Sequence, residues 1–274
     1  MKNFESYKLN LKKSLEQKLF FTKQLDLSQY DLIVDYGCGT GDVLMALVES
    51  GKLKPDCKLV GYDTNPDMIS YAKSRLVNSK KNITYVDNFL SLQENIKIEY
   101  NSLVIFSSVL HEIEAQEQLN IIDNIMLTCN TIVIRDMIAP QEENKRISRK
   151  IRKKVLKEMP RWQYDMFKST WGKIKRKKNL YRFLLMNEFV DNFETEVKED
   201  YFSVLWDKIN DTLVSYGYAR NVTDYTLSYR REQVLKRFGL FMGDYTHRNA
   251  IYYLPTEFSH ITCDVVGLPA GDEN

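Results

Sequence analysis

The sequence lacks the features that define several protein classes. Its four cysteines are scattered and form no CxxC pair, which argues against a disulfide framework and against a structural zinc site. No apolar run approaches the roughly 20 residues that a membrane-spanning helix needs. The lysine-rich stretch at residues 1–19 has no continuous apolar segment, so it does not resemble a secretory signal. We therefore expect a cytoplasmic protein with reduced thiols, no transmembrane segment and no metal.

Glycine is also scarce, yet three of the 11 glycines lie within five residues at Gly37, Gly39 and Gly41. A β-branched apolar run precedes them and a helix-forming run follows, which predicts a strand, a tight turn and a helix. Glycine lets the backbone turn sharply and approach a ligand closely, and the helix start presents free N–H groups.

The turn differs from the phosphate-binding loops. Asp42 stands where the GxGxxG fingerprint has its third glycine, and there is no Walker lysine. Asp35 and Asp42 would repel phosphates, so we expect a ligand with a cationic centre and no phosphate. Asp42 is either the N-cap of the helix or a partner of an amino group on the ligand.

Strands alternate with helices over the first 140 residues, which predicts an α/β fold with a parallel sheet. The expected strands are Leu32–Tyr36, Lys58–Tyr62, Ile83–Val86, Ser102–Phe106 and Thr131–Arg135. The expected helices are Phe4–Leu25, Asp42–Ser50, Asn65–Asn78 and Glu112–Leu127. Polar residues or glycines follow every strand, and ligands of such sheets bind beyond the carboxyl ends of the strands.

The later sequence predicts helices at Glu142–Pro160, Glu188–Asp211 and Tyr229–Phe238, then a hairpin of Leu240–Tyr245 and Ala250–Leu254. Between the first two helices, Arg161–Phe183 is basic with interleaved aromatic residues. We therefore expect a core at residues 1–140, a helical insertion at 141–225, and a last helix, hairpin and tail at 226–274. The insertion is basic, since Lys145–Arg182 holds 16 Lys and Arg against two acids. Such segregation of charge often marks an anionic partner.

The stretch Asp35-Tyr-Gly-Cys-Gly-Thr-Gly-Asp42 resembles motif I of the class I S-adenosylmethionine-dependent methyltransferases. Asp63 matches that family's acid for the two ribose hydroxyls, and Asp87 matches the residue at the adenine amino group. Ser107-Ser108-Val109-Leu110-His111-Glu112 resembles motif IV, at the mouth of the methyl-transfer pocket. The resemblance implies a Rossmann-like, doubly wound sheet of about seven strands, with an N-terminal helix and the late helical insertion. The cofactor residues that it implies are Asp35, Gly37, Cys38, Gly39, Gly41, Asp63, Thr64, Asp87, Asn88, Phe89 and Ser107.

The resemblance implies an enzyme that transfers the methyl group of S-adenosylmethionine and releases S-adenosylhomocysteine. His111 is the titratable candidate for a general base, and the alternative is a histidine that only forms hydrogen bonds at a helix start. The motif IV stretch Ser107–Glu112 has no cysteine, and no Asn/Asp-Pro-Pro-Tyr/Phe motif follows the fourth strand, so the two usual routes to DNA-base methylation are disfavoured.

The insertion allows two kinds of acceptor. Its bases and rings predict nucleic-acid binding, RNA before DNA, because cations neutralise phosphates and rings stack on unpaired bases. The alternative is a helical lid over a small-molecule acceptor, and a third hypothesis is a catalytically silent scaffold that binds S-adenosylmethionine. The candidate acceptor-binding residues are Ser108, Trp162, Trp171, Lys175, Arg176, Lys177 and Lys178. The oligomeric state stays open.

Overall fold

The computed structural model describes residues 15–76, 82–96, 100–138, 144–187, 193–198, 204–226, 236–240 and 246–255. The strands are β1 (Leu32–Tyr36), β2 (Lys58–Tyr62), β3 (Ile83–Val86), β4 (Ser102–Ser107), β5 (Thr131–Met137), β6 (Ala219–Thr226) and β7 (Thr246–Tyr253). The α-helices are α2 (Asp42–Glu49), α3 (Pro66–Ser74), α4 (Phe89–Asn95), α5 (Ala115–Met126), α6 (Arg149–Glu158), α7 (Arg161–Trp171), α8 (Lys177–Met186), α9 (Phe193–Glu196) and α10 (Trp206–Ser215). Short 3-10 turns are η1 (Phe20–Lys23), η2 (Leu27–Gln29) and η3 (Leu110–Glu112).

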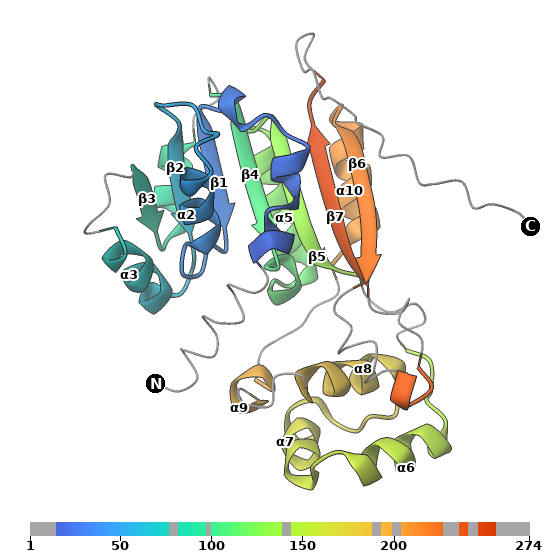
Figure 1. Cartoon of the computed structure of the whole chain (residues 1–274). Coiled ribbons are helices and arrows are strands. Elements are labelled where there is room, and N and C mark those ends of the chain that lie inside the picture. The colour runs from blue at the N-terminus through green and yellow to red at the C-terminus, as the bar shows by residue number, and fades with distance from the viewer. Residues whose placement is uncertain are drawn as a thin grey trace, which may run out of the picture.

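The strands form one seven-stranded sheet in the order β3-β2-β1-β4-β5-β7-β6 (Figure 1). Neighbours among β1 to β5 are parallel, and β7 runs antiparallel to both β5 and β6. Successive residues of a strand face opposite sides, so Ile33 and Val34 enter two different apolar clusters. One cluster includes side chains of α2 and α3, and the other includes side chains of α4, α5 and α10. The predicted Rossmann-like fold is therefore confirmed.

The five predicted strands of the parallel half are confirmed, with β4 and β5 one and two residues longer than expected. The leading helix is helical at residues 15–18 and then narrows to η1, while its start at Phe4 lies outside the described residues. The expected Glu112–Leu127 helix is α5, which begins three residues later at Ala115, after η3 has ended at Glu112. Helix α4 was not predicted. A seven-residue helix with a single buried residue, Leu92, gives little periodicity to detect.

The hairpin that completes the sheet was placed wrongly at its first strand. The expected strand Ala250–Leu254 is the second half of β7, which begins at Thr246 and ends at Tyr253. Its partner β6 lies at Ala219–Thr226, inside the range predicted as insertion. β6 is an edge strand with exposed side chains at residues 220–224, so it has no apolar run to reveal it. The expected strand at 240–245 lies almost wholly outside the described residues. α10, also inside the predicted insertion, contributes Trp206, Ile209 and Leu213 to the cluster on the sheet.

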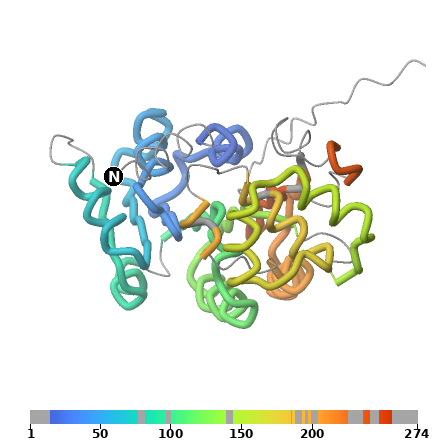
Figure 2. The backbone as a smooth tube through the Cα atoms, turned by 90° about the horizontal axis from the view of Figure 1, so that it is seen from below, coloured from blue at the N-terminus to red at the C-terminus, as the bar shows by residue number. Residues whose placement is uncertain are grey.

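The helices α6 to α9 form a small cap with an apolar cluster of its own, which includes Phe167, Tyr181 and Phe183. Helix α6 begins at Arg149, not at Glu142, because residues 144–148 are not helical and Ser148 accepts the N–H of Ile151 as N-cap. Gly172, at φ 80°, ends α7, so the basic and aromatic stretch Arg161–Phe183 is shared between α7 and α8. The cap lies beyond the carboxyl ends of the parallel strands (Figure 1). Viewed from that side, it overlies the α5 and α10 half and leaves the α2 and α3 half uncovered (Figure 2).

Candidate active site

The glycine loop lies between β1 and α2 and is fastened to the end of β2. The N–H groups of Gly37 and Cys38 donate to the carbonyl of Tyr62, at 2.7 and 2.9 Å. Gly37 has a φ of 74°, and a Cβ there would lie 2.8 Å from the Cβ of Val109. The loop therefore has no room for a side chain at Gly37 and presents bare backbone to the site.

Asp63, the predicted ribose-binding acid, also holds the glycine loop in place. Its Oδ2 accepts the N–H of Gly39 at 2.8 Å, and its Oδ1 accepts the N–H of Asn65 at 2.9 Å. Each carboxylate oxygen has two lone pairs, so Asp63 keeps capacity for further donors. Loop and acid thus form one rigid unit at the carboxyl ends of β1 and β2.

Asp42 is engaged within the protein. Its carboxylate accepts Nη1 of Arg75 at 2.7 Å and the hydroxyl of Thr40 at 2.6 Å. The N-cap of α2 is Gly41 and no side chain caps it, so the N-cap interpretation of Asp42 was wrong. Asp42 occupies the first turn, where its charge interacts favourably with the helix dipole.

A pocket opens between the glycine loop and the N-terminal segment. It is lined by Leu15, Lys18, Asp35, Gly37, Cys38, Thr40, Asp42, Val43 and Ser107. Asp35 is 2% exposed and its Oδ2 has no hydrogen-bond partner, and the buried hydroxyl of Ser107 has none either. Burial raises the pKa of Asp35 to about 7, an effect that the charge of Lys18 opposes and those of Asp63 and Asp42 increase. Buried polar atoms without a hydrogen-bond partner can form hydrogen bonds to a polar ligand.

Cys38 is not a nucleophile in this structure. Burial, reinforced by the charges of Asp35 and Asp63, raises the pKa of its thiol far above the ordinary value. The thiolate is the reactive form of cysteine, so the side chain remains inert. It packs in the apolar cluster under the loop.

The predicted adenine side lies at the end of β3. Tyr62 pairs with Val86 in the sheet, so Asp63 and Asp87 follow neighbouring positions on β2 and β3. Asp87 and Asn88 are exposed, and Asn88 caps α4 by accepting the N–H of Ser91 at 2.9 Å. Thr64 is exposed beside Asp63.

The ring of Phe89 is half-buried and meets the ring of Tyr62 edge to face, with their centroids 6.4 Å apart. Phe89 therefore stands at the same sheet edge as Asp87 and Asn88, where the family resemblance implies a wall of the adenine site.

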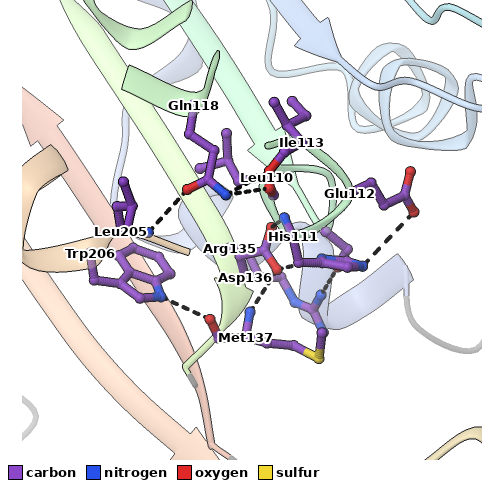
Figure 3. A network of polar contacts seen from close by, with 11 residues as sticks. Leu110, His111, Glu112, Ile113, Gln118, Arg135, Asp136, Met137, Leu205 and Trp206 are labelled. Carbon is purple, nitrogen blue, oxygen red and sulfur yellow. Dashed lines mark hydrogen bonds and ion pairs between the residues drawn. The ribbon is translucent and has the colours of Figure 1, made fainter. Parts of the chain in front are cut away.

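His111 belongs to a buried pair that the sequence did not predict. Its Nδ1 lies 2.6 Å from Oδ1 of Asp136, and its backbone N–H donates to Oδ2 of the same residue at 3.3 Å (Figure 3). Asp136 is fully buried at the end of β5 and also accepts the N–H of Met137 at 2.7 Å. A carboxylate at Nδ1 fixes that nitrogen as the proton donor and leaves Nε2 as the basic nitrogen. Nε2 lies 3.8 Å from Oε1 of Glu112, whose side chain is exposed.

The loop that carries His111 is hydrogen-bonded to Gln118, a fully buried residue of α5. Its amide donates to the carbonyls of Leu110 and Ile113 at 3.0 and 2.8 Å and accepts the N–H of Leu205 at 3.0 Å (Figure 3). The indole of Trp206 donates to the carbonyl of Met137 at 2.8 Å. The chain that returns from the cap is therefore joined to both the histidine loop and the end of β5.

Ser108 is the one described non-glycine residue with a positive φ, at 61°. Its N–H donates to the carbonyl of Arg135, and its hydroxyl accepts Nη1 of Arg135 at 2.6 Å. Backbone strain of this kind, which costs about 1–3 kcal/mol, gathers at functional sites. Ser107 lines the pocket at the glycine loop, and Ser108 follows it at the start of the segment that leads to His111.

The remaining predicted residues lie in the cap. Trp162 is 51% exposed and meets Phe193 edge to face, while the indole of Trp171 donates to the carbonyl of Val197 at 2.8 Å. Lys175 and Arg176 are exposed, and Lys177 and Lys178 are half-buried. No cap residue is among the described residues that line the pocket at the glycine loop.

The order of the strands, the glycine loop after β1, and the acids Asp63 and Asp87 after β2 and β3 together define the class of Rossmann-like S-adenosylmethionine-dependent methyltransferases. The family described as methyltransferase domain matches residues 28–188, which is more than half of the chain. The chain belongs to this family, and its cofactor is S-adenosylmethionine. The orphaned Asp35 and Ser107 and the side-chain-free cradle at Gly37 fit such a ligand.

Several solved structures have the same fold. The cyclase SpnF has 8% identity and a TM-score of 0.54, with 88% of this chain and 80% of that chain covered. The cyclopropane synthase MmaA2 from Mycobacterium tuberculosis has 7% identity and a TM-score of 0.53, covering 87% and 83%. A phosphoethanolamine N-methyltransferase 2 from Haemonchus contortus, in complex with S-adenosylhomocysteine, has 12% identity and a TM-score of 0.51, covering 88% and 53%.

The described residues contain no group of three or more His, Cys, Asp or Glu side chains placed to hold a metal ion. No helix in this part of the chain is long and apolar enough to cross a membrane.

Proposed function

We propose that the protein methylates a small molecule that carries a protonated oxygen or nitrogen and binds between the sheet edge and the cap. The observation that carries the proposal is the buried contact of 2.6 Å between His111 and Asp136 at the carboxyl end of β5. A base is needed where the attacking atom loses a proton, and a histidine oriented by a carboxylate is suited to that role.

The roles of the residues follow from the geometry. S-adenosylmethionine, when bound, supplies an electrophilic methyl group on a sulfonium. Nε2 of His111 would accept the proton that the acceptor atom loses on methylation. Asp136 stabilises the resulting imidazolium, and Gln118 keeps the loop in position. The attraction between the imidazolium and the carboxylate is stronger where water is excluded. The cap, which lies on this side of the sheet, helps to exclude water.

The glycine loop and its acids hold the cofactor in the same proposal. The backbone of Gly37, Gly39 and Gly41 approaches the amino-acid end, Asp63 binds the ribose, and Asp87, Asn88 and Phe89 surround the adenine. Asp63 is already oriented by the N–H groups of Gly39 and Asn65, so little ordering is needed when the ribose arrives.

The structure of the cap favours a small acceptor over a nucleic acid. Four of the six rings in the basic stretch are buried in the cluster of the cap and cannot serve as stacking platforms, namely Tyr164, Phe167, Tyr181 and Phe183. Trp162 is exposed. Trp171 is half-buried and covered by the guanidinium of Arg182 at 4.0 Å from its centroid. In our proposal the substrate-covering unit is the cap at 144–198, narrower than the range of 141–225 expected from the sequence.

The test is transfer of a labelled methyl group from S-adenosylmethionine into a cell extract that is separated into metabolites, RNA, DNA and protein. The proposal expects label in the metabolite fraction, and His111→Gln should abolish it. Label in RNA would instead support the nucleic-acid hypothesis. Binding of S-adenosylhomocysteine with no label in any fraction would support the silent scaffold.

A further inference from the structure

Lys18 is a charged residue of the cofactor pocket that lies before the residues matched by the family. Its half-buried side chain lines the pocket together with Asp35, Asp42 and Ser107. The segment around it is held in place, because Leu15 and Leu19 pack on the core and Gln17 accepts Nη2 of Arg135 at 3.2 Å. The lysine is therefore a fixed part of the pocket wall.

Lys18 lies near two carboxylates of the pocket without forming an ion pair with either. Its ammonium interacts electrostatically with Asp35 and Asp42, yet in the described part of the chain it forms no direct ion pair with either. Asp42 is already bound to Arg75 and Thr40. Asp35 has one oxygen with no partner. The pocket thus presents one cation and one available carboxylate, separated from each other.

We propose that Lys18 binds the carboxylate, and Asp35 the ammonium, of the amino-acid end of S-adenosylmethionine. The inference rests on S-adenosylmethionine as the cofactor and is independent of the acceptor. A zwitterion places its two charges on one carbon, so a separated cation and anion on the pocket wall complement it. Charge-assisted hydrogen bonds in a partly desolvated pocket are the strong ones.

A competing explanation assigns Lys18 only to the protein itself, as a counter-charge that makes burial of Asp35 tolerable. Removal of Lys18 would then affect every adenosine ligand equally, by disturbing the loop. The two explanations differ for ligands that lack a single charged group.

The experiment is calorimetry at pH 8, where Asp35 with its pKa of about 7 is ionised. It compares S-adenosylmethionine with decarboxylated S-adenosylmethionine, which lacks only the carboxylate, with no acceptor present. For Lys18→Met we expect affinity for S-adenosylmethionine to fall by about 10- to 100-fold, as for loss of a charged hydrogen bond, with affinity for the decarboxylated ligand unchanged. Asp35→Asn should weaken both ligands and leave 5′-methylthioadenosine, which has no amino-acid end, unaffected. Lys23→Met, at an exposed lysine of the same segment, is the matched control and should change nothing.

Lys18→Arg retains the cation and should retain the preference for S-adenosylmethionine, which guards against a general effect of the substitution on folding. Equal weakening of both ligands by Lys18→Met, or no weakening of either, would overturn the inference. If the unaltered protein bound no adenosine ligand at all, the cofactor assignment itself would be wrong, a result distinct from either.

Discussion

The half of the molecule with β1 to β3 and the half with β5 and the cap differ in how their site residues are held in place. The first half holds its loop with backbone donors and one acid, Asp63, within about 30 residues of chain. The second half also joins residues much farther apart in sequence, such as Gln118 to Leu205 and Met137 to Trp206. A shared cofactor can be bound by a local motif, whereas a particular acceptor needs a site assembled from several elements. We therefore expect variants in the two halves to have separable effects.

The largest expected effect separates chemistry from binding. His111→Gln removes the general base and should lower the rate of methyl transfer by about 10²- to 10⁴-fold, with affinity for S-adenosylhomocysteine unchanged. Initial rates and calorimetry measure the two quantities. Glu112→Gln, at the exposed neighbour 3.8 Å from the imidazole, is the control and should retain most of the rate. If His111→Gln left the rate of methyl transfer unchanged, the role of the histidine would be structural and not catalytic.

The next effect is on stability in the cofactor half. The native pKa of Asp35 is about 7 against an ordinary value of 3.8, so the folded protein holds a proton that the unfolded chain releases between these values. Stability contributed by this group therefore falls as pH rises from about 4 to about 7, and the full penalty, on the order of 4 kcal/mol, is present above pH 7.

Asp35→Asn removes that penalty. The variant should be more stable than the unaltered protein at pH 8, with the difference shrinking towards pH 4, while it binds cofactor more weakly. Denaturant unfolding at several pH values measures this. A difference that is constant with pH would show that Asp35 is ionised in the folded state, with Lys18 fully compensating its burial.

A third prediction concerns the loop backbone. Gly37→Ala meets Val109 and demands a left-handed conformation, so it should destabilise the protein by more than the 1–2 kcal/mol of that conformation alone and weaken cofactor binding. Gly51→Ala is a matched control, because Gly51 also has a positive φ, 66°, but has no atom within 4 Å of the added Cβ. Thermal unfolding and calorimetry compare the two. Equal effects of both would mean that the close approach at Val109 is unimportant.

A fourth, smaller effect tests the connection between the cap and the histidine loop. Gln118→Met leaves two carbonyls and one N–H without their partner and should cost about 1–3 kcal/mol of stability. We expect a lower transfer rate, and no change in affinity for S-adenosylhomocysteine. Loss of cofactor affinity in this variant would contradict the separation of the two halves.

The smallest expected effect lies on the surface of the cap. Alanine at Lys175, Arg176, Lys177 and Lys178 together should leave transfer to a small acceptor unchanged. A large loss of activity that depends on salt would favour the nucleic-acid hypothesis.

The two halves also differ in how far the sequence predicts them. Buried parallel strands such as Leu32–Tyr36 are continuous apolar runs, and the glycine loop is a contiguous motif, so both are visible locally. β6 was not predicted, because an exposed edge strand needs no apolar side chains. His111 was identified, but Asp136 lies 25 residues away and is brought to it only by the position of β5 in the sheet. Lys18 likewise reaches the pocket through packing of its segment, which no local pattern of residues predicts.

The most direct test of this division is a pair of measurements on Asp136→Asn, made with the acceptor that the labelling experiment identifies. We predict that affinity for S-adenosylhomocysteine stays as in the unaltered protein, while the rate of methyl transfer falls by at least about 100-fold because the imidazole loses its orienting carboxylate. An unchanged rate, or a parallel loss of affinity and rate, would contradict the assignment of cofactor binding and proton removal to separate halves of the molecule.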